Sequence, residues 1–429
     1  MRLYSNVYDT FSIGHDRTCK IKNIVDHYIT RLELDVDELE RMNPVSKACH
    51  LLVLSEMYQF LAGSEEKWDH IIYLYMDSIR NDIYKNKLGN RLSLFGGLAD
   101  VAFAVYSISS LTGNFGKFLD SLNKLIADVL LKQIHILKQT PLDTGHYDII
   151  LGVSGVLNYL LCTYTKEEKI DMVLKEAIMY LSDLCEFKII DDNYVPGWYT
   201  KSYKSPFREG MMTENFNYSL SHGIAGVLVV LARSLKLNII EPKFSKSVKI
   251  VLQEMYKQSI LEPNGCYYWH GRFYISDYLK EKKPAIEDKR MSWCYGSPGI
   301  LRAMHVAAQS VHDEYMLNFC KDAFLSLVNL PIQEYGFASP TICHGYSGML
   351  MVLKEQYHDT PDEKIHNSII EITDIILRMY SKNSRYGYFG KEGIDEDDSN
   401  SLLEGAAGVV LILISMLKKE TVFQKHFAI

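Results

Sequence analysis

The chain has 429 residues, of which 47% are apolar and 23% are charged, and its formal net charge is −7. The apolar fraction allows a large core and excludes a disordered chain, and the negative charge argues against a nucleic-acid-binding surface. The longest uncharged apolar run, Gly405 to Leu417, is shorter than the roughly 20 residues of a membrane-spanning helix. The first residues scatter charged side chains and contain no apolar signal segment. We therefore expect a soluble cytoplasmic protein.

A short unit recurs along the chain. It consists of two glycines three residues apart, followed at once by about ten apolar-rich residues. Five copies begin at Gly152, Gly223, Gly296, Gly345 and Gly405, a weaker copy begins at Gly97, and a decayed copy begins at Ser46. The weaker copy has Asp100 in place of the second glycine. Each pair predicts a close backbone approach at the start of a helix that is apolar nearly all round and therefore buried.

Amphipathic helices are predicted between these buried helices. Their expected bounds are Glu66–Tyr84, Phe115–Leu137, Lys166–Leu184, Phe244–Ile260, His312–Val328 and Asp362–Tyr380. A buried inner helix followed by an amphipathic outer helix, repeated about seven times, predicts an all-α fold of the closed α/α barrel type.

Two segments interrupt the helical pattern. Residues 189–219 and 262–290 are long, aromatic and rich in turn residues, which predicts short strands and loops. Long loops in a compact domain are usually functional. We expect residues 1–429 to form a single domain with these two non-helical insertions, which would make a small β-containing extension or a lid.

The two positions before each repeat glycine should lie at one end of the barrel, where the inner helices begin. Cys and His make up 22 of 429 residues, so chance would place fewer than one at these positions. Four are found: His222, Cys294, Cys343 and His344. Two thiolates and one imidazole suit zinc with a fourth position open. His222 would be a free base or the fourth ligand, and the alternative is that both cysteines are small core residues.

Three motifs together resemble those of the lanthionine synthetase C-like cyclases. They are Trp293-Cys294-Tyr295-Gly296 followed by Pro298-Gly299, Cys343-His344-Gly345 followed by Gly348, and Ser221-His222-Gly223 followed by Gly226. Within these cyclases the chain resembles stand-alone bacterial lanthipeptide cyclases of the nisin-cyclase type. The resemblance covers nearly the whole chain.

This resemblance implies a fold and an activity. The fold would be an α/α toroid, a double ring of about seven inner and seven outer helices. The activity would be addition of precursor-peptide cysteine thiols to dehydroalanine or dehydrobutyrine, which forms lanthionine and methyllanthionine thioether rings. One zinc ion per chain would be bound by Cys294, Cys343 and His344, because these match the family's ligands.

The resemblance also implies three catalytic residues. His222 matches the acid/base histidine, Arg290 a family arginine suited to stabilise an enolate, and Asp148 the active-site aspartate that would orient His222. Residue chemistry alone offers plainer alternatives: Arg290 as a solvated charge in a polar loop, and Asp148 as the cap of the helix near Gly152.

The expected partners are a dehydrated precursor peptide with its leader, a separate dehydratase and a peptide exporter, with no nucleic acid. The dehydratase must be separate because the toroid accounts for nearly all the residues. Such a complex would bring the cytoplasmic enzyme to the inner membrane face through its partners.

Three other functions compete with the cyclase. A protein prenyltransferase subunit needs a basic diphosphate pocket, and no Lys/Arg cluster at the repeats supplies one. A related zinc enzyme that adds glutathione to dehydroamino acids would use the same centre. A non-catalytic peptide-binding scaffold would be expected to lose the metal ligands, and all three are present.

Overall fold

The computed structural model describes residues 11–61, 65–201, 214–239, 244–286, 289–390, 398–418 and 420–429. The contacts divide the chain into two compact units. The first unit comprises the described residues within 1–91, 96–122 and 337–427, and the second those within 92–95, 123–336 and 428–429. Among the described residues, no helix is long and apolar enough to cross a membrane.

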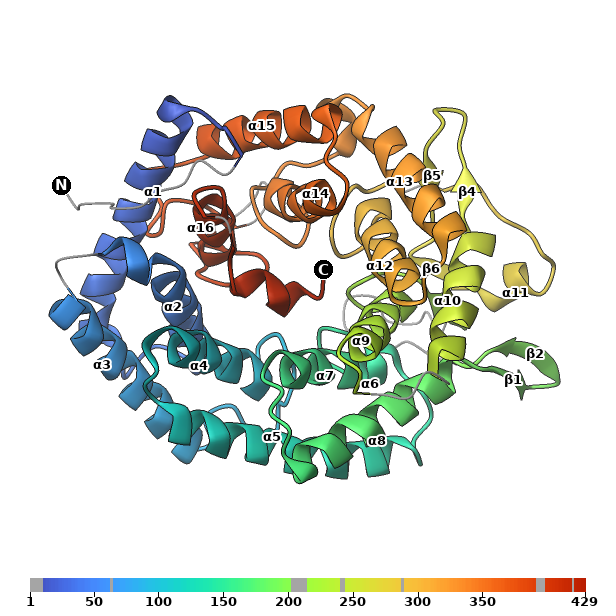
Figure 1. Ribbon diagram of the computed structural model, residues 1–429, viewed down its shortest axis with the longest axis horizontal. Helices are drawn as coiled ribbons and strands as arrows, with labels where there is room; N and C mark the ends of the chain where they lie inside the picture. The colour runs from blue at the N-terminus through green and yellow to red at the C-terminus, as the bar shows by residue number, and fades with distance from the viewer. Residues whose placement is uncertain are drawn as a thin grey trace. The chain divides into compact units, whose positions relative to one another are not determined.

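The first unit is built of helices in two layers (Figure 1). Its helices are α1 (His15–Leu34), α2 (Pro44–Met57), α3 (Glu65–Tyr84), α4 (Leu98–Thr112), α14 (Tyr346–Asp359), α15 (Glu363–Arg378), α16 (Ala406–Ser415) and the start of α5 (Gly116–Leu137). Short 3-10 turns cover Asp35–Glu38, Tyr58–Phe60 and Phe423–Phe427. Helix α16 packs against α14 and α2, and α2 packs against α4, while α15 covers α14 and α3 covers α2.

Burial separates inner from outer helices as the sequence predicts. Every residue of α16 is buried, so this helix has no solvent face. In α15 the buried residues are Ile365, Ser368, Ile369, Ile372, Thr373 and Ile376, which recur every three or four positions along one stripe. The opposite face of α15 therefore remains in contact with water.

The second unit repeats this arrangement. Its helices are α6 (Thr144–Tyr147), α7 (Val153–Cys162), α8 (Glu168–Cys185), α9 (Ile224–Lys236), α10 (Ser245–Lys257), α11 (Ile275–Tyr278), α12 (Ser297–Ser310), α13 (Glu314–Val328), the remainder of α5 and a 3-10 turn at Ile332–Tyr335. The buried helices α7, α9 and α12 pack in that order, and α8, α10 and α13 lie against them.

Three two-stranded antiparallel sheets belong to the second unit. Strand β1 (Phe187–Ile190) pairs with β2 (Asn193–Pro196), β3 (Asn215–Asn217) with β6 (Arg272–Tyr274), and β4 (Ile260–Leu261) with β5 (Tyr267–Tyr268). Pairing of β3 with β6, with Phe216 opposite Phe273, joins the two segments that interrupt the helical pattern. The predicted small β-containing part is therefore present, and residues 202–213 and 287–288 of those segments lie outside the described residues.

The second glycine of a repeat allows a helix to begin in contact with its own preceding loop. A Cβ atom on Gly155 would lie 2.1 Å from the carbonyl oxygen of Ile149, and one on Gly299 would lie 2.1 Å from that of Trp293. Both distances are far below van der Waals contact, so only glycine fits at these positions.

Backbone hydrogen bonds join the loops that precede successive inner helices. In the second unit the amide of Ile149 donates to the carbonyl of Ser221 at 3.2 Å, and that of Leu220 donates to the carbonyl of Cys294 at 3.1 Å. In the first unit Cys343 donates to Leu403 at 2.9 Å. Residues just before the repeat glycines are therefore held together within each unit.

The two degenerate repeats use polar contacts instead of a glycine pair. Helix α2 begins at Pro44, and the Asn43 side chain accepts a hydrogen bond from the Ser46 amide at 2.9 Å, which is a standard N-cap. Asp100 accepts a hydrogen bond from the Gly96 amide at 2.8 Å, and its other oxygen lies 3.4 Å from Nε2 of the buried His426.

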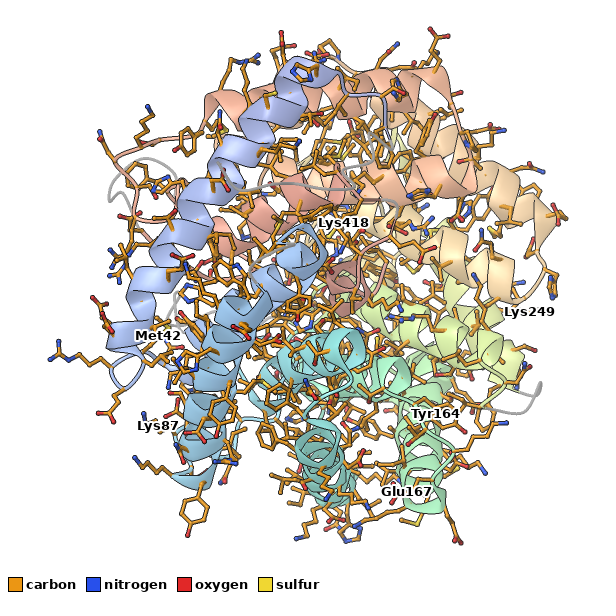
Figure 2. All side chains as sticks on the ribbon, turned by 60° about the vertical axis from the view of Figure 1, so that its left-hand side comes forward. Met42, Lys87, Tyr164, Glu167, Lys249 and Lys418 are labelled. Carbon is orange, nitrogen blue, oxygen red and sulfur yellow. The ribbon has the colours of Figure 1, made fainter. Side chains whose placement is uncertain are left out.

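The C-terminal segment of the first unit is fixed by a second buried acid. The amides of Val422, just before the 3-10 turn, and of Phe423, its first residue, donate to Oε1 of Glu56 at 2.6 and 3.0 Å. The Lys418 side chain, labelled in Figure 2, donates to Oε2 of Glu56 at 2.5 Å. Glu56 therefore holds this segment against helix α2, and Asp100 of helix α4 lies beside it.

Candidate metal centre and acid–base pair

Each predicted metal ligand lies in a loop that leads into a buried helix. Cys294 lies two residues before Gly296 and is 1% exposed, and Cys343 and His344 directly precede Gly345 and are more exposed. The carbonyl of Cys294 accepts hydrogen bonds from the amides of Leu220 and Ser221 at 3.1 and 3.3 Å. The backbone on either side of the donors is therefore fixed by the repeat geometry.

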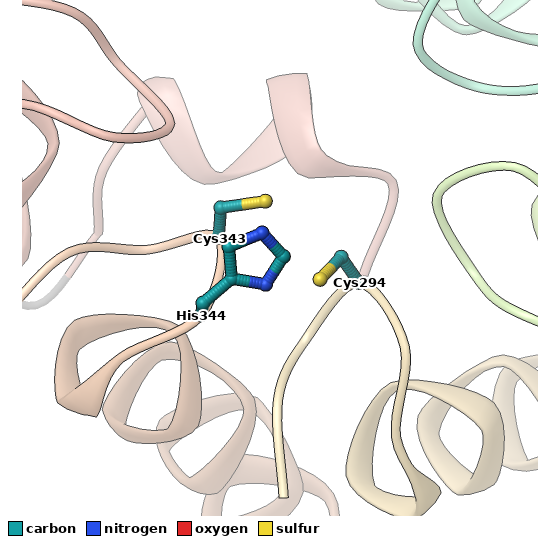
Figure 3. A group of neighbouring side chains, drawn as sticks. All are labelled: Cys294, Cys343 and His344. Carbon is teal, nitrogen blue, oxygen red and sulfur yellow. The ribbon is translucent and has the colours of Figure 1, made fainter. Parts of the chain in front are cut away.

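The side chains of Cys294, Cys343 and His344 point toward one another (Figure 3). One ligand atom of each, a sulfur or a ring nitrogen, lies within 4.8 Å of the other two, which is close enough to share one ion. Two sulfurs and one imidazole nitrogen fit tetrahedral zinc, and three protein ligands leave one position for an exchangeable ligand. The donor set therefore fits the zinc ion that the sequence predicts.

Neighbouring polar groups contact two of the donors. The Ser292 hydroxyl lies 3.5 Å from the Cys294 sulfur and is held by the backbone of Tyr295, whose carbonyl accepts from it at 2.9 Å. Nε2 of His344 lies 3.9 Å from Oε1 of Glu404, and both side chains are about half exposed, so solvent screens this ion pair.

Sequence reasoning missed these two neighbours. Glu404 occupies the position directly before Gly405, the same repeat position that His222 and His344 occupy. A search of that position for every polar residue would have found it.

Asp148 contacts both His222 and the backbone turn that precedes α7. Its Oδ2 lies 2.5 Å from Nδ1 of His222, and its Oδ1 accepts hydrogen bonds from the amides of Leu151 and Gly152 at 2.6 and 2.9 Å. The two amides belong to the turn that opens α7. One carboxylate therefore caps the helix start with one oxygen and holds the histidine with the other.

This contact determines the protonation pattern of the imidazole. Asp148 is completely buried, and an ionised carboxylate can only accept hydrogen bonds. Nδ1 of His222 must therefore carry the proton, which leaves Nε2 as the basic nitrogen of the neutral ring. The side chain of His222 is 36% exposed, so substrate can reach it. Burial, together with the charge of Asp148, raises the pKa of Tyr147 well above its usual value, so this neighbouring phenol stays neutral.

Of the two remaining residues near the repeat loops of the second unit, Tyr295 lies beside this pair. The Tyr295 ring lies 6.0 Å from the His222 ring, and its hydroxyl accepts a hydrogen bond from the Asn217 amide group at 3.0 Å. Arg290 is exposed and directly precedes Met291, which forms a β-bridge with Gly296. The metal-ligand group comprises Cys294, Cys343 and His344, while His222 is engaged by Asp148.

Comparisons with known proteins indicate one family. The sequence profile of the lanthionine synthetase C-like protein family matches residues 48–427. The nisin biosynthesis protein NisC of Lactococcus lactis subsp. lactis is 27% identical over 337 residues, which cover 75% of this chain and 73% of that protein. A solved structure of nisin cyclase superposes with a TM-score of 0.77 at 22% identity and covers 96% of this chain and 97% of its own.

The structural likeness confirms the predicted fold class, because the nisin cyclase fold is matched over almost the whole length of both chains. That fold is the α/α toroid expected from the resemblance. The profile match extends over far more than half of the residues. The chain therefore belongs to the lanthionine synthetase C-like family.

Proposed function

We propose that this protein is a zinc-dependent lanthipeptide cyclase, which closes thioether rings in a dehydrated precursor peptide. The observation that carries the proposal is the group formed by Cys294, Cys343 and His344, with ligand atoms within 4.8 Å of one another. Membership of the lanthionine synthetase C-like family and the similarity to NisC support the same activity.

The reaction is an addition without a leaving group. A cysteine sulfur of the peptide bonds to the β-carbon of a dehydroamino acid, the double-bond electrons move toward the adjacent carbonyl, and a proton is then added at Cα. Because the thiolate is the nucleophile, the thiol must first lose its proton. One zinc ion held by the three donors would bind this thiol at its open position and favour the loss of its proton.

The residues of the chain supply the proton transfers. Nε2 of His222 takes the thiol proton and returns a proton to Cα, because Asp148 keeps the proton on Nδ1 at all stages. Asp148 also stabilises the charged imidazole between the two transfers. Arg290, which is exposed near Gly296, stabilises the negative charge that develops on the enolate oxygen.

The substrate implies further partners. A precursor peptide with its leader is the substrate, and a separate dehydratase must first form the dehydroamino acids. We include a peptide exporter in the same complex, with the cyclase in the cytoplasm and reaching the inner membrane face through these partners. The similarity to a nisin biosynthesis protein supports the peptide substrate.

Zinc content and ring closure test the proposal together. Elemental mass spectrometry should find about one zinc per wild-type chain and a large loss in Cys343→Ala, because a tetrahedral site needs all three donors. Cys162→Ala is the matched control, since Cys162 is also partly exposed but lies outside the donor group. Ring closure leaves the mass unchanged, so it is followed by counting the thiols that remain open to alkylation. A Cys343→Ala variant with full zinc and full ring closure would contradict the mechanism.

A further inference from the structure

A polar cavity of about 270 Å³ opens in the first unit. Its lining includes Arg41, Ser46, Arg385, Tyr386, Asp398 and Asn400, which come from the loop before α2, the first turn of α2 and the segments before α16. Ser46 marks the degenerate first repeat. The cavity, which we call the Asn400 pocket, therefore lies at the end of the unit where its buried helices begin.

Asn400 lines this pocket and carries a hydrogen-bond donor that is not used. The side chain is 8% exposed, and its Oδ1 accepts a hydrogen bond from the Tyr28 hydroxyl at 2.7 Å. Its Nδ2 is buried and has no hydrogen-bond partner among the residues that the structure describes. A buried amide donor without a partner is rare and unfavourable, so a ligand with an acceptor oxygen would complete the site.

Most of the charges around the pocket are already paired. Arg385 contacts Asp35 and Glu38 at 2.6 and 2.7 Å through Nη2, while Asp398 accepts hydrogen bonds from the Ser384 hydroxyl at 2.5 Å and the Arg385 amide at 2.8 Å.

Arg41 differs from these paired groups. Its guanidinium is exposed and has no ion-pair partner within the described part of the chain. A cavity lined by both a guanidinium and an unused amide donor favours a carboxylate over a neutral acceptor, because hydrogen bonds to a charged oxygen are stronger.

The pocket is close to two of the candidate zinc ligands. Leu403 follows Asn400 by three residues, which span at most about 11 Å. The Leu403 carbonyl accepts a hydrogen bond from the Cys343 amide at 2.9 Å. A peptide anchored at Asn400 would therefore need only a few extended residues to reach Cys343.

We propose that the Asn400 pocket binds an aspartate or glutamate side chain of the precursor peptide and thereby anchors the peptide beside Cys343 and His344. This inference rests on the proposed cyclase function, because it names a contact of that enzyme with its substrate. Asn400 and Arg41 are binding residues in this proposal, and neither one touches the reacting atoms.

Binding of the fluorescein-labelled, undehydrated precursor peptide, measured by fluorescence anisotropy, tests the proposal. Asn400→Asp keeps an oxygen that accepts from Tyr28 but replaces the NH₂ group with a second acceptor oxygen. This oxygen cannot donate to a carboxylate and repels it, so peptide binding should weaken about 10- to 30-fold. Arg41→Gln should weaken it about threefold, because an exposed charge is partly screened. Lys249→Gln removes another exposed positive charge, from α10 in the second unit (Figure 2), and should leave binding unchanged.

Peptide variants identify the bound group. Each aspartate or glutamate of the precursor is changed in turn to asparagine or glutamine, and one change should weaken binding to the wild-type protein about tenfold. The affinity of that changed peptide should be only slightly lower for the Asn400→Asp protein than for the wild-type protein, because the two changes remove the same contact. For ring closure, Asn400→Asp should raise KM and leave kcat within about twofold of wild type.

Two results would overturn the inference: equal binding of all the acid-to-amide peptides, or wild-type binding by both pocket variants. If Asn400→Asp does not fold by circular dichroism, Arg41→Gln decides alone, since its side chain is exposed. Failure of the cyclase proposal is a separate result. A wild-type protein that binds the precursor through this pocket but closes no ring would contradict the activity and leave the pocket in place.

Discussion

The contact between Asp148 and His222 allows a sharp test, because replacing Asp148 with asparagine changes one atom. The Asp148 side chain accepts from the amides of Leu151 and Gly152, just before α7, through one oxygen and from His222 through the other. An asparagine can keep its oxygen toward only one side. If its NH₂ group faced the two backbone amides, both amides would lose their acceptor, and each would cost about 1–3 kcal/mol of stability. The oxygen should therefore stay with the helix, and the NH₂ group should face His222.

The expected loss follows from this orientation. An NH₂ group can only donate, so Nδ1 of His222 must become the acceptor and the ring proton must move to Nε2. The basic nitrogen is then no longer available, and ring closure should slow about 10²- to 10⁴-fold, the usual contribution of general acid–base catalysis. This corresponds to about 3–5 kcal/mol of barrier. Stability should fall by only about 1 kcal/mol, because asparagine caps helices as well as aspartate does.

The assay measures the ring-closure rate of Asp148→Asn by thiol alkylation and its melting temperature by circular dichroism. Asp143→Asn is the matched control, because Asp143 caps α6 through its side chain in the same way but does not contact His222. If Asp148 acts through His222, Asp148→Asn should add little to the defect of His222→Asn. A wild-type rate in Asp148→Asn, or a fully additive double variant, would refute this mechanism.

Further expectations concern packing and pH. Gly155→Ala should lower the free energy of unfolding by more than about 2 kcal/mol, because the new Cβ would collide with the carbonyl oxygen of Ile149. Gly116→Ala is the control and should leave the free energy unchanged, because no atom lies within 4 Å of the added Cβ. Chemical denaturation measures both values. Burial lowers the pKa of His50 to about 4 in the folded chain. Between pH 6.5 and 4 the unfolded chain therefore binds more protons than the folded chain, so the free energy of unfolding falls as the pH decreases. Between pH 7 and 5 the free energy of unfolding of the wild type should fall by about 2 kcal/mol. The control His70→Gln, which changes an exposed histidine, should lose the same amount, and His50→Gln should lose less. Equal losses in all three proteins would show that His50 is not the cause.

Sequence alone predicts the helices where a repeat rule applies. Helices α7 and α12 begin directly after Gly152 and Gly296, as the glycine pairs indicate. Helix α1 was not predicted, because no glycine pair precedes it. The start of α2 depends on the Asn43 cap and Pro44, which are local signals rather than part of the repeat.

The candidate site was also predicted only in part from the sequence. The excess of Cys and His before the glycines leads to the donor group from residue chemistry alone. The pairing of His222 with Asp148 joins residues 74 positions apart, and only the family resemblance suggested it. The unused donor of Asn400 depends on Tyr28, which is 372 positions away, so no local pattern contains that information.

Asp100 affects which helices can pack against one another when the chain folds. Helical pairs that resemble one another offer similar apolar faces, so a helix could dock beside the wrong neighbour at little cost in hydrophobic burial. A buried carboxylate is unfavourable against any neighbour that cannot pair with it. Asp100 lies beside His426, and Glu56 accepts the amides of the same C-terminal turn. The repeat that lost its glycine therefore marks one helix as different from its copies, and this loss of symmetry selects a single arrangement of the first unit.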